Sequence, residues 1–315
     1  MNVHVPGAFS WGGQAAFVSK GTLHELVENI PSFNRVPFSL GGPSNKYYDL
    51  IVRPEPADKA PIPIGVVSKK YRLIQHRELV NHIVQGMNKL QLQPDRAAAE
   101  LCLTDYGARM RLRVLFPGYS LDPGDGQDVS MRLVCYNSVD GSGSLEVFTE
   151  WFRLVCSNGL AWEEEERYRR IHHENYLNLE SVAAHLDKTM QQLSSQADNL
   201  KKMMNRQVDE GTVVSWVDRW VTEFWGVQKA ARVLHICRTG RDAKIVPPPF
   251  AARLRASEYE VIPLAVVPGA PQIAANAYHV CHALTWLVRN NTNIGSEWQM
   301  TKDVSRLMAK LGEVG

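Results

Sequence analysis

The chain has 315 residues, of which 44% are hydrophobic and 22% are charged, as is typical of folded proteins and not of disordered ones. Its formal net charge is only +2, so a nucleic-acid partner cannot be argued from global charge and depends on where the charges lie. Its five cysteines occur singly, which favours a reducing compartment. The first residues do not resemble a secretory signal, and no apolar run reaches the ~20 residues of a membrane span. We therefore expect a cytoplasmic protein without a membrane partner.

The first 46 residues predict an N-terminal arm and a short helix. Residues 1–20 are rich in glycine and small side chains, as in an arm that is loosely ordered or docks elsewhere. Thr22 is a suitable N-cap for a helix that Pro31 would end.

A β-rich domain is expected from residue 47 to residue 160. Strands are predicted at 47–53 and 64–68, and a helix with one apolar face at 76–90. A hairpin follows, with strands at 98–104 and 109–116. In its second strand the odd positions from 109 to 113 are arginines and the even positions are apolar, which predicts a half-buried strand with a basic outer surface.

The longest β-rich stretch runs from Met131 to Leu160. It reads as two strands that fold back through the turn Asp140-Gly141-Ser142-Gly143, because Asp-Gly tolerates the positive φ that tight hairpins require. Adjacent strands joined by short turns favour an antiparallel meander with a helix packed on one face.

From residue 161 to 315 the chain is predicted to be mainly helical, packing on or extending from the β-rich domain. Helices are expected at 178–207, 213–225 and 276–290, with a short one after Asn293. Trp216, Trp220 and Phe224 share one stripe of the second helix, and such stripes are more often core than cofactor contacts. The predicted fold class is therefore α+β.

No pattern in the sequence predicts catalysis, a metal or a cofactor. His279 and His282 have helical metal-pair spacing, but a third ligand at a recognisable spacing is missing. The glycines at 141 and 143 lack the spacing and the lysine of a phosphate loop, and the turn at 157–159 is not a nucleophile elbow. We expect a protein that is not an enzyme.

The distribution of bases is the main functional observation. Residues 66–120 contain nine bases against four acids, interleaved with tyrosines, and a groove that binds phosphates and stacks bases requires this combination. The alternative is a solvated sheet face with no ligand. The candidate nucleic-acid-binding residues are Lys69, Lys70, Tyr71, Arg72, Arg109, Arg111, Arg113, Arg132 and Arg153.

Four segments resemble a known family. They are Val67-Ser-Lys-Lys-Tyr-Arg-Leu-Ile74, Tyr136-Asn-Ser-Val-Asp-Gly-Ser-Gly143, Arg153-Leu-Val-Cys-Ser-Asn-Gly-Leu160 and Asn276-Ala-Tyr-His-Val-Cys-His-Ala-Leu-Thr-Trp286. Over about residues 47–290 the chain resembles a family of phage- and plasmid-encoded proteins catalogued as domain of unknown function 932. The resemblance implies a mobile-element protein and transfers no catalytic residue. At the level of architecture alone, the predicted plan is also similar to that of single-strand annealing recombinases.

The leading hypothesis is a non-enzymatic plasmid or phage protein that binds single-stranded nucleic acid, with single-stranded DNA as the expected partner. It would anneal complementary strands as a homo-oligomeric ring or filament, and the sequence leaves the preference for DNA or RNA open. Two alternatives remain open. One is an interaction protein that acts on host defence or replication proteins through its Trp-rich helical half. The other is a metal-dependent nuclease.

Overall fold

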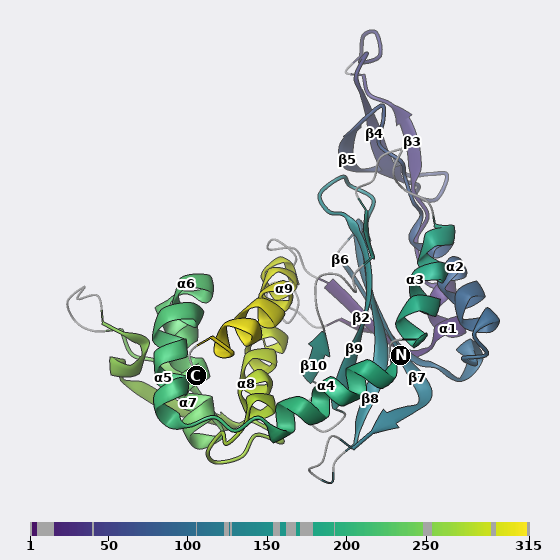
Figure 1. Ribbon diagram of the computed structural model, residues 1–315. Helices are drawn as coiled ribbons and strands as arrows, with labels where there is room; N and C mark the ends of the chain where they lie inside the picture. Colours follow the sequence, from purple (N-terminus) through teal and green to yellow (C-terminus); the bar gives the residue numbers. More distant parts are fainter. Residues whose placement is uncertain are drawn as a thin grey trace. The chain divides into compact units, whose positions relative to one another are not determined.

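The structure is a computed structural model (Figure 1). It describes residues 2–4, 16–39, 41–104, 106–122, 126, 128–153, 158–161, 168–170, 179–191, 193–247, 254–290 and 294–313. The chain forms two compact units. Unit 1 comprises residues 1–119, 131–149 and 166–192, and unit 2 comprises residues 120–130, 150–165 and 193–315.

Antiparallel strand pairing dominates the first half of the chain, and helices dominate the second, which confirms the α+β class. Among the described residues, eight strands form one sheet in the order β1-β2-β6-β7-β8-β9-β10, with β11 also pairing with β9. These strands are β1 (Asn2–His4), β2 (Ala16–Thr22), β6 (Ala98–Thr104), β7 (Arg109–Leu121), β8 (Val129–Ser138), β9 (Leu145–Arg153), β10 (Asn158–Ala161) and β11 (Tyr168–Arg170). Strands β6 to β10 follow each other as a meander, as predicted.

The N-terminal segment contributes more to the sheet than an arm would. Strand β2 pairs antiparallel with β6 along its whole length, so residues 16–20 are an ordered part of the sheet and not a loosely ordered segment. Helix α1 (Leu23–Glu28) follows directly. Thr22 caps it through a reciprocal capping box with Glu25, and this pattern was readable in the sequence.

Helices α1, α2 (His76–Lys89) and α3 (Glu180–Gln191) complete unit 1. α1 packs against β2 and β6, and α2 packs against α3. α2 buries Leu79, Val80, Ile83 and Met87, the apolar face that its periodicity predicted. A short 3-10 helix, Pro94–Arg96, leads into β6.

A separate three-stranded sheet lies between α1 and α2 in the sequence, and it is drawn at the top of Figure 1. Here it is called the small sheet; it consists of β3 (Asn34–Pro37), β4 (Tyr48–Arg53) and β5 (Ile62–Ser68), all antiparallel. One of its faces supplies Ile51 and Val67 to a buried cluster with Phe33, Tyr71 and Val139. The small sheet is thereby anchored to the turn between β8 and β9.

Unit 2 is a helical assembly with a two-stranded ribbon. Its helices are α4 (Leu193–Asn205), α5 (Glu210–Trp216), a π-helical turn (Val217–Val221), α6 (Thr222–Trp225), α7 (Val227–Thr239), a 3-10 turn (Ala256–Glu258), α8 (Ala277–Arg289) and α9 (Ile294–Leu311). The ribbon pairs β12 (Arg241–Ile245) with β13 (Val261–Val266). In the described part of the chain, no helix is long and apolar enough to cross a membrane.

Two indole N–H groups fix the position of α9 in unit 2. Trp216 donates to the Leu307 carbonyl at 2.8 Å, and Trp225 donates to the Asp303 carboxylate at 3.2 Å. Both tryptophans are buried. Trp216 and Trp225 are therefore core residues. Their rings are not accessible to a protein partner.

Candidate nucleic-acid interface

The nine candidate residues fall into two groups with different environments. One group lies on the large sheet, on β7, β8 and β9, and the other directly follows β5 of the small sheet. The two groups are considered in turn, because their exposure decides which can reach a ligand.

The arginines of β7 are mostly buried and are paired with acids. The side chains of Arg109, Arg111 and Arg113 are 17%, 1% and 11% exposed. Arg111 and Arg113 lie 3.5 and 3.0 Å from Glu100 on the neighbouring β6, and Arg109 lies 3.1 Å from Asp140. The predicted basic outer surface is therefore wrong. Alternation separates two chemically different faces of a strand, but it does not show that the polar face meets water.

Glu100 is at the centre of this buried cluster. Burial acts to raise the pKa of Glu100, but the charges of Arg113, Arg111, Lys20 and Arg132 outweigh it, so the pKa lies below its usual value. Glu100 is thus held as a carboxylate, and it balances part of the positive charge inside the sheet. Arg132 is itself buried, which adds it to this structural group.

Arg153 ends β9, but its side chain lies outside the described part of the structure. Its predicted role remains a prediction.

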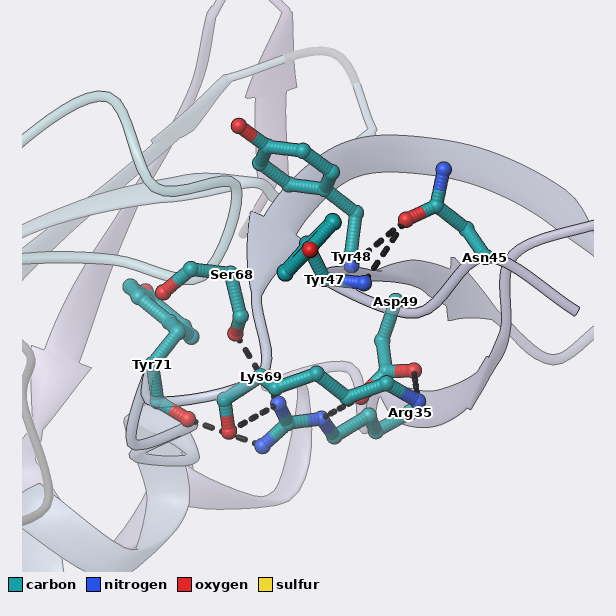
Figure 2. A network of polar contacts seen from close by, with 8 residues as sticks. All are labelled: Arg35, Asn45, Tyr47, Tyr48, Asp49, Ser68, Lys69 and Tyr71. Atoms are coloured by element: carbon teal, nitrogen blue, oxygen red, sulfur yellow. Dashed lines mark hydrogen bonds and ion pairs between the residues drawn. The ribbon is translucent and has the colours of Figure 1, made fainter.

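A network of polar contacts organises the second group of candidates (Figure 2). Arg35 on β3 pairs with Asp49 on β4 at 2.7 Å, and Lys69 pairs with the other carboxylate oxygen of Asp49. The guanidinium of Arg35 also donates to the carbonyls of Ser68, Lys69 and Tyr71 at 2.8–3.0 Å. One arginine therefore fixes the backbone that leaves β5 and carries Lys69, Lys70 and Arg72.

Asp49 is the anionic centre of that network. The hydrogen bond from Lys69 is the main reason that the pKa of Asp49 is lowered; burial opposes this effect, and Arg35 adds to it. The carboxylate stays charged and keeps both cations in place. Lys70, the next residue along, is exposed.

Two adjacent tyrosines lie beside these cations. Tyr47 and Tyr48 are 66% and 48% exposed, and Figure 2 shows the ring of Tyr48 directed away from the Arg35–Asp49–Lys69 network. The side-chain oxygen of Asn45 accepts hydrogen bonds from the N–H groups of both tyrosines, at 2.8 and 3.0 Å. The backbone N–H of Lys69 donates to the Tyr47 carbonyl at 2.9 Å. The start of β4 and the end of β5 are thereby held together.

We call this region the tyrosine–lysine end. It consists of Lys46, Tyr47, Tyr48, Lys69, Lys70 and Arg72. The ammonium of Lys46 lies 5.6 Å from the centre of the Tyr47 ring, within the range of a cation–π contact. Over residues 34–72 the chain has seven bases and three acids, and two of these acids are paired, Asp49 with Arg35 and Lys69 and Glu55 with Arg53.

Tyr71, the predicted stacking residue, has a different environment from Tyr47 and Tyr48. Its side chain is buried in the core below the small sheet, and its hydroxyl donates to the Ser138 carbonyl at 2.9 Å. Burial raises the pKa of Tyr71 well above its usual value. From sequence alone, Tyr47 and Tyr48 are predicted only to begin a strand. The Lys-Tyr-Tyr sequence just after a Gly-Gly-Pro turn was the signal that could have identified them.

The two histidines of α8 each interact with the backbone. The Nδ1 atom of His279 accepts from the Ala275 N–H at 3.2 Å, and Nε2 of His282 lies 2.9 Å from the Pro268 carbonyl oxygen. Among the described residues, no three or more His, Cys, Asp or Glu side chains are grouped so that they could hold a metal ion.

Comparison with protein families gives one result. Residues 63–239 match the model of DUF932, a domain of unknown function. The chain belongs to the DUF932 family. The matched region includes nearly all of β5 and Lys69, Lys70 and Arg72 of the tyrosine–lysine end, whereas Tyr47 and Tyr48 precede it. The segment 276–286, which also resembles the family, lies beyond the matched region. No curated protein and no solved structure matches the chain.

Proposed function

We propose that this protein binds single-stranded nucleic acid, in the first place single-stranded DNA, at the tyrosine–lysine end. The observation that carries the proposal is the close arrangement of two exposed tyrosine rings and several exposed cations at one end of a small, internally braced sheet. The buried arginines of β7 are left out, because cations already held by Glu100 and Asp140 inside the sheet are poorly placed to contact phosphates.

The chemistry favours a single strand over a duplex. An aromatic ring can stack only on a base whose face is open, as in unpaired strands, and each such stack contributes ~1–3 kcal/mol. Lysine and arginine side chains beside the rings neutralise the backbone phosphates and release counterions. Since every base has a flat face, this arrangement predicts binding with little sequence preference.

The stacking element of the proposal is tested with fluorescence anisotropy of a labelled single strand at low salt. The double variant Tyr47→Ala/Tyr48→Ala should bind about tenfold more weakly or worse, because two stacks are lost. Tyr106→Ala is the matched control: Tyr106 is as exposed as Tyr48 but lies in the turn between β6 and β7. The proposal fails if the wild-type chain does not bind, or if Tyr106→Ala weakens binding as much as the double variant.

The proposal extends to a mobile-element protein of phage or plasmid origin that anneals complementary strands as a homo-oligomer. The resemblance to the DUF932 family supports the phage or plasmid origin. The β-meander followed by helices supports the comparison with annealing recombinases. The test mixes two complementary strands, one carrying a fluorophore and the other a quencher. Annealing should be faster with the wild-type chain than with Tyr47→Ala/Tyr48→Ala, and equal rates would contradict this extension.

A further inference from the structure

The small sheet has a core face and an open face. Its core face carries Ile51 and Val67, which are buried in one cluster with Val139. Side chains alternate along a strand, so Leu50 and Val66 lie on the opposite, open face. Val66 is 49% exposed, and Leu50 is half-buried.

The strand register aligns the apolar residues of the open face. Val36 on β3 pairs with Leu50 on β4, and Leu50 pairs with Val66 on β5. Directly opposed residues project to the same side of a sheet, so these three side chains form one row across the three strands, here called the aliphatic row. The irregularity in the pairing of β4 with β5 falls after Ile51 and leaves this part of the register intact. Since neighbouring strands lie ~4.8 Å apart, the row is ~10 Å long.

Tyr48 continues the open face toward the tyrosine–lysine end. It precedes Leu50 by two positions and pairs with Ser68, so its ring lies on the same side of the sheet as the aliphatic row. The ring is 48% exposed. Lys69 and Lys70 follow Ser68 directly, and both are exposed. The face therefore runs from a set of cations, past an aromatic ring, onto an aliphatic surface.

We propose that the bases of a bound single strand extend from Tyr48 across the aliphatic row, while the neighbouring cations hold its phosphates. Every base offers a flat face to a ring or an apolar surface. A stacked strand rises ~3.4 Å per nucleotide, so the row receives more than one base. This inference rests on the proposed function and enlarges its site from the tyrosine–lysine end to the open face of the small sheet.

The charges and the shape of the face favour this occupant. The register places positions 36, 48, 50, 66 and 68 on the open face, and none of them is charged. The cations at its edge suit a polyanion, whereas a second copy docked through the same face offers no acid to pair with them. A membrane-binding surface inserts its apolar side chains ~5–10 Å into the lipid boundary, but Val36 and Leu50 are half-buried between neighbouring strands.

Substitution of Val66 tests the inference with two strands that differ only in their bases. One is a thymine oligonucleotide, and the other is an abasic strand of the same length, which keeps the phosphates. Val66→Ser should weaken binding of the thymine strand about fivefold, because apolar contact is lost, and should leave binding of the abasic strand unchanged. Val266→Ser is the matched control: Val266 is 59% exposed on β13 of unit 2, and its variant should bind both strands like the wild-type chain. Circular dichroism checks that both variants are folded.

A gain of affinity tests the same contact in the opposite direction. Val66→Tyr adds a stacking surface to the row, in a residue type that strands favour. It should bind the thymine strand about fivefold more tightly, whereas Val266→Tyr should not change the affinity. Tighter binding cannot result from a misfolded variant.

Four results would overturn the inference. They are a Val66→Ser variant that binds the thymine strand like the wild-type chain, a variant that loses affinity equally for both strands, a wild-type dimer that Val66→Ser dissociates, and vesicles of anionic lipid that the wild-type chain binds and Val66→Ser does not. Failure here is distinguishable from failure of the proposed function, because Tyr47→Ala/Tyr48→Ala weakens strand binding whether or not the bases continue onto the aliphatic row. A wild-type chain that binds neither strand overturns both.

Discussion

At the scale of single residues, Glu100 explains why the alternating arginines of β7 are structural. It lies opposite Arg113 in the pairing of β6 with β7 and accepts contacts from both Arg111 and Arg113. Two arginines that alternate along a strand thus become part of the interior of a sheet. The period of the pattern was visible in the sequence, but the partner strand that supplies the acid was not.

Removing the charge of Glu100 should destabilise the fold. Glu100→Gln removes the negative charge that the guanidinium groups of Arg111 and Arg113 contact inside the sheet, and breaking a buried pair in this way costs up to about 3–5 kcal/mol. Urea denaturation would measure the loss. Lys20→Ala is the control: it removes a partner of Glu100 that is 75% exposed, and exposed pairs contribute at most about 1 kcal/mol. If the two substitutions lower the free energy of unfolding equally, the buried contacts of Glu100 do not stabilise the fold as proposed.

The same carboxylate should make stability depend on pH. The pKa of Glu100 is lower in the folded chain than its usual value of 4.5, so the folded state favours its charged form. Its contribution is present above pH 4.5 and is lost as the pH falls through the lowered folded pKa. Urea midpoints between pH 6 and pH 3 should therefore fall less steeply for Glu100→Gln than for the wild-type chain. Parallel pH profiles would contradict this assignment.

At the scale of elements, most helix and strand positions followed from periodicity and capping residues. The helix that begins at Glu210 shows what periodicity could not supply. It contains a π-helical turn at 217–221, which inserts a residue and rotates the face that follows. Its core side chains are therefore Trp216, Val221 and Trp225, and the predicted stripe of Trp216, Trp220 and Phe224 is wrong beyond its first member.

Gly65 of the small sheet closely approaches the turn between β8 and β9. A Cβ atom at this position would lie 2.6 Å from the backbone oxygen of Asp140, so Gly65→Ala should displace the strand and destabilise the fold by about 1–3 kcal/mol. Gly42→Ala is the matched control, because nothing lies within 4 Å of its added methyl group. Thermal unfolding compares the two, and an unchanged melting temperature for Gly65→Ala would show that this contact is not maintained.

Helix α8 depends on its N-cap. Asn276 accepts a hydrogen bond from the His279 N–H at 2.9 Å, at the start of a helix that is buried along most of its length. Asn276→Ala should cost about 1 kcal/mol, whereas Asn276→Asp keeps a capping oxygen and should cost about 0.5 kcal/mol or less. Urea denaturation measures both, and an equal loss in the two variants would show that the capping bond is not the cause.

At the scale of the whole molecule, the sequence predicted an α+β chain with its strands first. It did not predict that β2 joins the sheet through β6, because this pairing spans about eighty residues and leaves no local pattern. The candidate site was found in part. Lys69, Lys70 and Arg72 lie at the tyrosine–lysine end, beside Tyr47 and Tyr48. The arginines of β7 belong to a different, mostly buried group, and only the fold reveals this difference in burial.

The central claim is that exposed cations at the tyrosine–lysine end bind the phosphates of a single strand. The salt dependence of affinity measures this most directly, because each neutralised phosphate adds about 0.7 to the slope of log K against log salt for single strands. Lys46→Ala/Lys70→Ala/Arg72→Ala retains Lys69 and its pairing with Asp49. The control Lys59→Ala/Lys89→Ala/Arg96→Ala removes two lysines and one arginine elsewhere in unit 1, all three of them exposed.

We predict that the first triple variant binds single-stranded DNA more weakly, with a slope shallower by about 2, and that the second keeps the wild-type slope. Identical slopes for the wild-type chain and the first variant, or an equal change in both variants, would contradict the claim.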